Sequence, residues 1–165
     1  MSTKETYGRI DSGQYYFWGG PLSLGWCYPF EWKEKHFKCA WQALAYEKSL
    51  ALNPSLSDNI LKDNFSEHAR DFYFKMDTND NIMAWQKEKE EVVAIEILNL
   101  ISVQHPHFAE QLLDTDPLEL IYCGAEDYLS IGLPYWHKSA NHMDNWKGDN
   151  KYGKWLMSVR ENLKK

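Results

Sequence analysis

Hydrophobic and polar positions along the chain predict short strands near its start. Residues 15–18 are four aromatic side chains in a row, closed by Gly and Pro, which is typical of a strand. Large side chains then alternate from Trp26 to Trp32, and this period of two predicts a strand with one buried face. Pro29 lacks an N–H group and places that strand at a sheet edge. Residues 1–14 are polar and predict a lead outside the domain.

Helical spacing and helix-forming composition dominate the middle of the chain. The predicted helices are residues 37–52, two short segments capped by Ser57 and Ser66, residues 85–102 and residues 106–114. The apolar run from Val92 to Ile101 predicts that the fourth of these is the central buried helix. Between the segment capped by Ser66 and the helix of residues 85–102, residues 77–81 predict a polar loop.

The last third of the chain returns to short elements. Residues 118–123 predict a strand, residues 128–133 a strand or a loop, and residues 134–145 a polar surface insertion. Long helices with a few strands predict an α+β fold, mainly helical around a small β-sheet. A chain of 165 residues that is 44% hydrophobic is about one domain long, and we assign that domain to residues 15–165.

The closing stretch, residues 145–160, joins a turn rich in Gly, Asn and Asp to a helix with apolar residues at helical intervals. A loop at a helix N-terminus presents unpaired N–H groups and the positive end of the helix dipole, which suit a phosphate. An ordinary capped terminal helix is the alternative interpretation.

Composition limits the partners and cofactors. A net charge of −6 argues against broad binding to a nucleic acid backbone and leaves a single nucleotide or a modified base as a possible ligand. Cys27, Cys39 and Cys123 are an odd number without CxxC spacing, and the six His residues lack the spacing of metal ligands. No segment is apolar enough for a leader or a membrane span. We therefore expect a cytoplasmic protein with no metal and no cofactor.

The closing stretch has the pattern WKGxNxxGxxLMxVR, which resembles the final signature of the NADAR (YbiA-like) domain family. Residues 20–30, 37–42, 85 and 126–133 are similar to further segments of that family, so the resemblance covers about residues 15–163. It implies an N-glycosidase that cleaves between ribose and a base or amine, either in phosphorylated riboflavin intermediates or at ADP-ribosylated guanine. Such cleavage passes through an oxocarbenium-like sugar and needs a nearby carboxylate.

The chain departs from the family pattern at its acidic position. Trp41 stands where the family has a helix glutamate, and Leu129 stands where it has a tryptophan. Lys48 matches the family lysine and, seven residues further along a helix, lies within about 20° of the face of Trp41. Glu47 is about 120° away from that face and does not replace the glutamate.

The resemblance implies a nucleotide-sized cleft between the helix from Cys39, the 126–133 loop and the closing motif. The candidate catalytic carboxylates are Asp127, Glu126 and Asp149. The candidate ligand-binding residues are Trp41, Lys48, Trp85, Trp146, Gly148, Asn150, Gly153 and Arg160.

Several of these residues have a structural alternative. Trp41 is either a core residue or a stacking surface for a base, and Lys48 is either a solvated charge or a phosphate or ribose ligand. Trp85 is either a ligand-binding residue or a hydrophobic staple at the start of its helix. Asp127 is either a catalytic carboxylate or the cap of a turn. Arg160 binds either phosphate or a core carboxylate.

Three functions therefore follow from the sequence. The first is an N-glycosidase acting on an ADP-ribosyl or ribosyl-phosphate small molecule, or on an ADP-ribosylated nucleic acid base. The second is a domain that binds an ADP-ribose-like nucleotide without turnover. The third is a protein-interaction scaffold.

Overall fold

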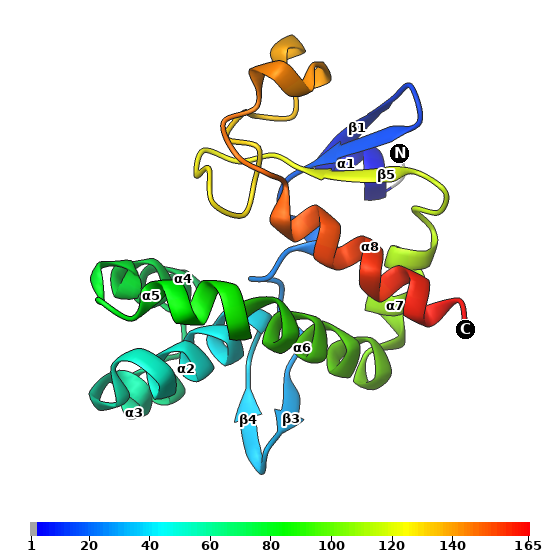
Figure 1. Ribbon diagram of the computed structural model, residues 1–165. Coiled ribbons are helices and arrows are strands. Elements are labelled where there is room, and N and C mark those ends of the chain that lie inside the picture. The colour runs from blue at the N-terminus through cyan, green and yellow to red at the C-terminus, as the bar shows by residue number, and fades with distance from the viewer. Residues whose placement is uncertain (1–2) are drawn as a thin grey trace. The chain divides into compact units, whose positions relative to one another are not determined.

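The computed structural model describes residues 3–165, which form two compact units. Residues 3–23 and 107–165 make up what we call the terminal unit, and residues 24–106 make up the central unit. Figure 1 shows the elements of each unit along the chain. The structure is mostly helical with a small sheet, as the sequence predicts.

The terminal unit is built on a three-stranded sheet of order β1-β2-β5. Strand β1 runs antiparallel to β2, and β5 runs parallel to β2 with Tyr15 opposite Leu120. Its elements are α1 (Thr3–Tyr7), β1 (Gly8–Asp11), β2 (Gln14–Phe17), the 3-10 turn η1 (Gly20–Leu22), α7 (Pro106–Leu113), β5 (Glu119–Tyr122), the 3-10 turns η5 (Lys138–Asn141) and η6 (Met143–Asn145), and α8 (Lys151–Leu163).

The prediction of a polar lead before Tyr15 was wrong. Gly8–Asp11 is strand β1 and pairs with all of β2, from Gly8 opposite Phe17 to Asp11 opposite Gln14. Only Gly8 of this strand is buried, so an edge strand with mostly solvent-facing side chains has no apolar alternation to reveal it.

Helix α8 confirms the helical spacing of the closing stretch. Tyr152, Leu156 and Val159, at positions i, i+4 and i+7, are fully buried. Figure 1 shows α8 running beside β5. This packing fixes the closing motif against the sheet.

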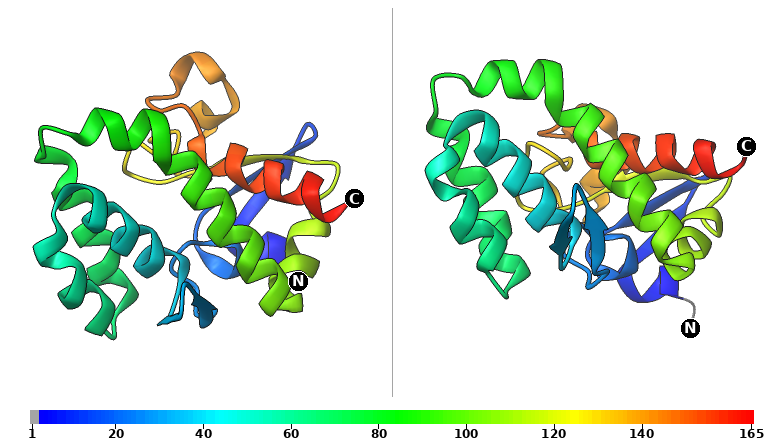
Figure 2. Two further views of the ribbon diagram at one scale, coloured as in Figure 1. Left: turned by 60° about the horizontal axis from the view of Figure 1, so that its bottom comes forward. Right: turned by 90° about the horizontal axis from the view of Figure 1, so that it is seen from below.

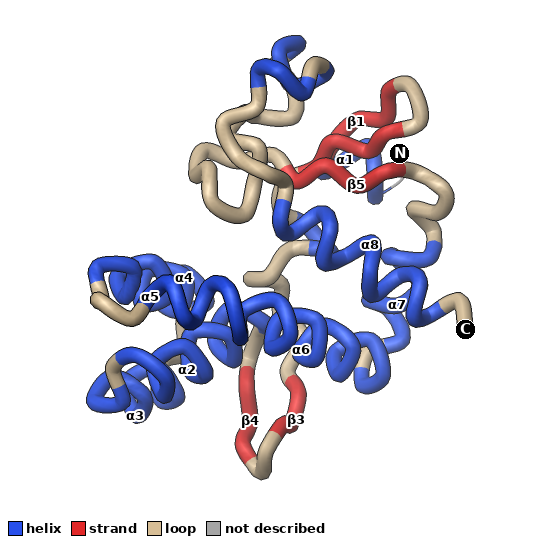
Figure 3. The backbone as a smooth tube through the Cα atoms, viewed as in Figure 1, coloured by secondary structure: helices blue, strands red, loops and turns tan. Residues whose placement is uncertain are grey.

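The central unit is a helical cluster with a two-stranded hairpin, drawn in red in Figure 3. Helix α2 packs against α3, α4 and α6, and Figure 2 shows these helices from two further sides. The elements are β3 (Phe30–Trp32), β4 (Lys35–Phe37), α2 (Ala40–Leu52), the 3-10 turn η2 (Pro54–Leu56), α3 (Ser57–Lys62), α4 (Ser66–Lys75), the 3-10 turn η3 (Met76–Thr78), α5 (Ile82–Ala84), the π-helical turn η4 (Trp85–Lys89) and α6 (Glu90–Gln104).

One predicted strand is shorter than expected, and a second stretch takes one of its two predicted forms. The strand predicted from Trp26 begins only at Phe30, directly after Pro29, which has no N–H group to donate to a ladder. The stretch of residues 128–133 is a loop, one of its two predicted forms.

Two details of the helices also differ from the predictions. Ser57 and Ser66 are the first residues of α3 and α4, not their caps, and Leu56 and Phe65 occupy the capping positions without a side-chain hydrogen bond. Helix α6, predicted to be the central buried helix, buries one face only, and Val92 on the other side is 67% exposed.

Within residues 3–165, none of the helices is long and apolar enough to cross a membrane.

Candidate functional site

Trp41 occupies a packed position on the first turn of α2. The residue is 6% exposed, and the centre of its ring lies 5.4 Å from the ring centre of Tyr73 and 5.6 Å from that of Phe74, both on α4. Its backbone N–H donates to the carbonyl of Leu24. In this structure Trp41 therefore has the environment of a core residue, the first of its two predicted roles.

Lys48 is buried on the same face of α2. Its Nζ donates to the backbone carbonyl of Tyr73 at 2.7 Å and to Asp77 Oδ1 at 2.5 Å, and it lies 3.9 Å from the centre of the Tyr73 ring. Trp41 and Lys48 thus share one face of α2, as their seven-residue spacing predicts, and both contact Tyr73. Burial lowers the pKa of Lys48, although the hydrogen bond and charge of Asp77 and the charge of Glu90 act in the opposite direction.

Trp85 belongs to the same cluster through the hydroxyl of Tyr73. Trp85 Nε1 donates to that oxygen at 3.2 Å, and the hydroxyl donates to the carboxylate of Glu90. Trp85 and Glu90 are 2% and 1% exposed, so this end of the cluster is closed to solvent. We call Lys48, Tyr73, Asp77, Trp85 and Glu90 the Lys48 cluster.

Tyr73, Asp77 and Glu90 were missed by sequence reasoning. In an α-helix, Trp85 and Glu90 would lie about 140° apart, because five residues make about 500°. The backbone N–H of Glu90 instead donates to the carbonyl of Trp85, an i→i+5 bond of a π-helical turn, which puts both side chains on one face. Glu90 lies in the charged run Lys87–Glu91, whose other members are exposed, so no sequence pattern marked it as buried.

The 126–133 loop is held by its own polar side chains. Glu126 Oε2 accepts the backbone N–H groups of Tyr128 at 2.7 Å and Leu129 at 2.9 Å. Ser130 is buried and its Oγ accepts the N–H of Gly132 at 3.0 Å. Glu126 therefore acts as a cap of this loop, while Asp127 is exposed to solvent.

Asn150 joins the closing motif to the sheet. Its Oδ1 accepts the N–H of Tyr122 at 2.8 Å, and its Nδ2 donates to the carbonyl of Leu120 at 2.8 Å. Its backbone is left-handed, with φ 57° and ψ 42°. A Cβ on Gly153 would lie 2.3 Å from the Leu120 carbonyl oxygen. Asn and Gly at these two positions are thus explained by close approach of α8 to β5.

Gly148 serves a second close approach, between the closing motif and the 126–133 loop. A Cβ at this position would lie 2.1 Å from the carbonyl oxygen of Asp127 and 2.2 Å from that of Ser130. The neighbouring Asp149 is exposed. Trp146 is half-buried, and its Nε1 donates to the carbonyl of Ala140 at 2.7 Å.

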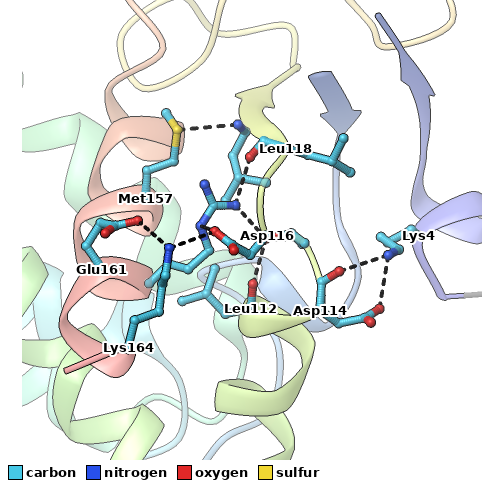
Figure 4. Close-up of polar contacts among 11 residues, drawn as sticks. Lys4, Leu112, Asp114, Asp116, Leu118, Met157, Glu161 and Lys164 are labelled. Atoms are coloured by element: carbon cyan, nitrogen blue, oxygen red, sulfur yellow. Dashed lines mark hydrogen bonds and ion pairs between the residues drawn. The ribbon is translucent and has the colours of Figure 1, made fainter. Parts of the chain in front are cut away.

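Arg160 pairs with a carboxylate, which is one of its two predicted roles. Its side chain is buried, Nη1 donates to Thr115 Oγ1 at 2.9 Å and to the Leu118 carbonyl at 2.8 Å, and Nε lies 3.6 Å from Asp116 Oδ1. Figure 4 shows Lys164 reaching the same carboxylate, at 3.2 Å. The guanidinium thereby fastens α8 to the segment before β5.

The cysteines differ in exposure. Cys27 is exposed, whereas Cys39 and Cys123 are buried. Burial raises the pKa of both buried thiols, and that of Cys123 rises to about 12. Among residues 3–165, no three His, Cys, Asp or Glu side chains are grouped closely enough to hold a metal ion.

The predicted site residues therefore fall into two groups. Trp41, Lys48 and Trp85 meet in the central unit around Tyr73. The other predicted residues belong to the terminal unit: Glu126, Asp127, Trp146, Gly148, Asp149, Asn150, Gly153 and Arg160.

Comparison with known proteins agrees with this architecture. The family model of the NADAR domain matches residues 16–164, and the chain belongs to that family. A solved structure with a similar fold is the NMR structure of the E. coli protein YbiA, with a TM-score of 0.72 and 19% sequence identity over 98% of this chain and 91% of that one. The comparison with curated proteins found no match.

Proposed function

We propose that this chain is an N-glycosidase that hydrolyses the bond between a ribosyl carbon and a nitrogen. Its substrate would carry an ADP-ribosyl or ribosyl-phosphate group, either as a small molecule or on a modified guanine base. The observation that carries the proposal is the NADAR match across residues 16–164. The buried Lys48, at the position of the family lysine, adds support from this chain's own residues.

The three candidate carboxylates of the terminal unit, Asp127, Glu126 and Asp149, differ in what they offer to such a reaction. Asp127 and Asp149 are exposed and accessible to a substrate that arrives from solvent. Glu126 already accepts two backbone N–H groups, so using it would release them from the loop. Asp127 and Asp149 are thus the better candidates within the terminal unit.

A binding function without turnover is the second candidate. It is supported by Trp41, which stands at the family's acidic position and is packed against Tyr73 and Phe74. In that case the domain would take up an ADP-ribose-like nucleotide and leave its N-glycosidic bond intact.

One experiment separates these two functions. The protein is incubated with an ADP-ribosylated guanosine oligonucleotide and with a phosphorylated riboflavin intermediate, and mass spectrometry follows release of the sugar fragment. Calorimetry with ADP-ribose measures binding in parallel. Product release supports hydrolysis, and binding without product supports the second candidate. If the protein releases no product and binds no ADP-ribose, both candidate functions are overturned.

Substitutions then assign the acid. Asp127→Asn and Asp149→Asn each remove one of the two exposed acids of the terminal unit. A fall in kcat in one variant identifies that carboxylate as a participant in hydrolysis. Asp144→Asn is the matched control, because Asp144 is likewise an exposed acid in the terminal unit but lies outside the closing motif.

A further inference from the structure

The Lys48 cluster brings together one ammonium and two carboxylates beside Tyr73 of α4. Lys48 of α2 and Glu90 of α6 each contact Tyr73, and Asp77 of η3 accepts a hydrogen bond from Lys48. Removing such charges from water costs several kcal/mol for each ion before their pairing is counted. Buried charge clusters of this kind are found preferentially at functional sites.

Only one acid of the cluster is accessible to solvent. The side chain of Asp77 is 37% exposed, whereas that of Lys48 is 1% exposed and Glu90 as a residue is 1% exposed. Glu47, the acid next to Lys48 along α2, forms an ion pair with Lys33 at 3.2 Å. A ligand arriving at the cluster therefore meets the Asp77 carboxylate first.

The charges of the cluster favour a cation over an anion. One ammonium and two carboxylates leave a formal charge of −1, and the ammonium already has Asp77 and the Tyr73 carbonyl as acceptors. A phosphate would have to displace one of these partners and approach two carboxylates. A sugar that develops positive charge at its anomeric carbon is attracted by the same arrangement.

We propose that Asp77 is the catalytic carboxylate of this chain, held in place by Lys48, and that the Lys48 cluster takes the ribosyl end of the substrate. This inference rests on the proposed N-glycosidase function. Asp77 stabilises the positive charge on the anomeric carbon and accepts a proton from the attacking water.

The step balances with water as its only co-reactant. The bond between the anomeric carbon and nitrogen breaks, and its electron pair leaves with the nitrogen, which takes up a proton from solvent. The water oxygen bonds to the anomeric carbon, and the proton it loses passes to Asp77 and then to solvent.

The test compares Asp77→Asn and Asp77→Ala with Asp80→Asn, an exposed acid three residues further along. The assay is mass-spectrometric release of the sugar fragment from an ADP-ribosylated guanosine oligonucleotide and from a phosphorylated riboflavin intermediate. We expect kcat to fall by about 10²- to 10⁴-fold in both Asp77 variants, as for loss of a general base, and to stay within about twofold in Asp80→Asn. Thermal unfolding confirms that each variant is folded.

Added formate distinguishes a catalytic carboxylate from a structural one. Formate should restore part of the activity of Asp77→Ala and leave Asp77→Asn inactive, because the Asn amide still fills the position. Wild-type activity in Asp77→Asn, or a folded, inactive Asp77→Ala that formate does not rescue, would overturn this assignment. No hydrolysis by the wild type would instead overturn the proposed function itself.

Discussion

The ammonium of Lys48 lies 3.9 Å from the centre of the Tyr73 ring and donates to the backbone carbonyl of the same residue. This pairing holds a lysine on α2 against α4 inside the central unit. Its cost is desolvation, which lowers the pKa of Lys48.

Lys48→Met should remove a pH dependence of stability. The folded pKa of Lys48 is lower than the ordinary lysine pKa of 10.5, so between these two values the unfolded chain binds more protons than the folded chain. The free energy of unfolding of the wild type should therefore rise with pH in this window, relative to Lys48→Met. The other titrating groups contribute equally to both proteins, so their contributions cancel in the difference between the two free energies of unfolding.

Urea unfolding of the two proteins at a series of pH values between about 7 and 10.5 measures this difference. Lys38→Met is the control, because Lys38 is an exposed lysine of the same unit. A difference that stays flat or falls with pH would show that burial of Lys48 does not shift its titration.

Substitutions at Asn150 should separate its side-chain bonds from its backbone conformation. Asn150→Gly keeps the left-handed backbone but leaves the Tyr122 N–H and the Leu120 carbonyl without their side-chain partner. We expect a loss of about 2–4 kcal/mol in the free energy of unfolding, from about 1–3 kcal/mol for each group. Asn150→Ala should cost about 1 kcal/mol more, because φ 57° strains a residue with a Cβ. Equal stability of all three proteins in urea would contradict the structural role of Asn150.

Gly153→Ala should be strongly destabilising, and Gly25→Ala nearly neutral. A Cβ at position 153 would lie 2.3 Å from the backbone oxygen of Leu120, which cannot move without disturbing the sheet. At position 25 the nearest atom is on Trp41 at 3.5 Å, an ordinary contact. Overpacking of this kind costs about 1–3 kcal/mol or more, so the melting temperature should fall clearly in Gly153→Ala only. Similar melting temperatures for the two variants would show that α8 does not approach β5 this closely.

Alkylation of the folded protein should modify a single cysteine. Cys27 is exposed, whereas burial restricts access to Cys39 and Cys123 and raises the pKa of both thiols. Because the thiolate is the reactive form, iodoacetamide at about pH 8 should label Cys27 first, and all three only after denaturation. Peptide mass spectrometry gives the order of labelling. Rapid labelling of Cys123 in the folded protein would show that its surroundings open readily.

Local patterns in the sequence predicted the helices well. Helix α8 follows from the spacing of Tyr152, Leu156 and Val159, and α7 begins at Pro106 as expected. Strand β1 escaped detection because its pairing with β2 depends on backbone groups, which leave no mark on an exposed edge. The strand predicted from Trp26 was too long because large residues also alternate in the irregular segment before Phe30.

The candidate site depends more on contacts distant in sequence, and these were harder to predict. The shared face of Trp41 and Lys48 follows from helix geometry. Their common partner Tyr73 does not, since it lies on another helix, and Glu90 turns inward only through the π-helical turn before it. The motif predicted the fold of the closing stretch, but it did not reveal that Asn150 hydrogen-bonds to β5.

The most direct test of the N-glycosidase proposal is hydrolysis in ¹⁸O-labelled water. An ADP-ribosylated guanosine oligonucleotide and a phosphorylated riboflavin intermediate are each mixed with excess protein, and the products of the first turnover are analysed by mass spectrometry. Cleavage of the bond between the anomeric carbon and nitrogen should place one ¹⁸O on the released sugar fragment and none on the base or amine. Absence of a released sugar fragment from both substrates, or ¹⁸O found only on a phosphate, would contradict the proposal.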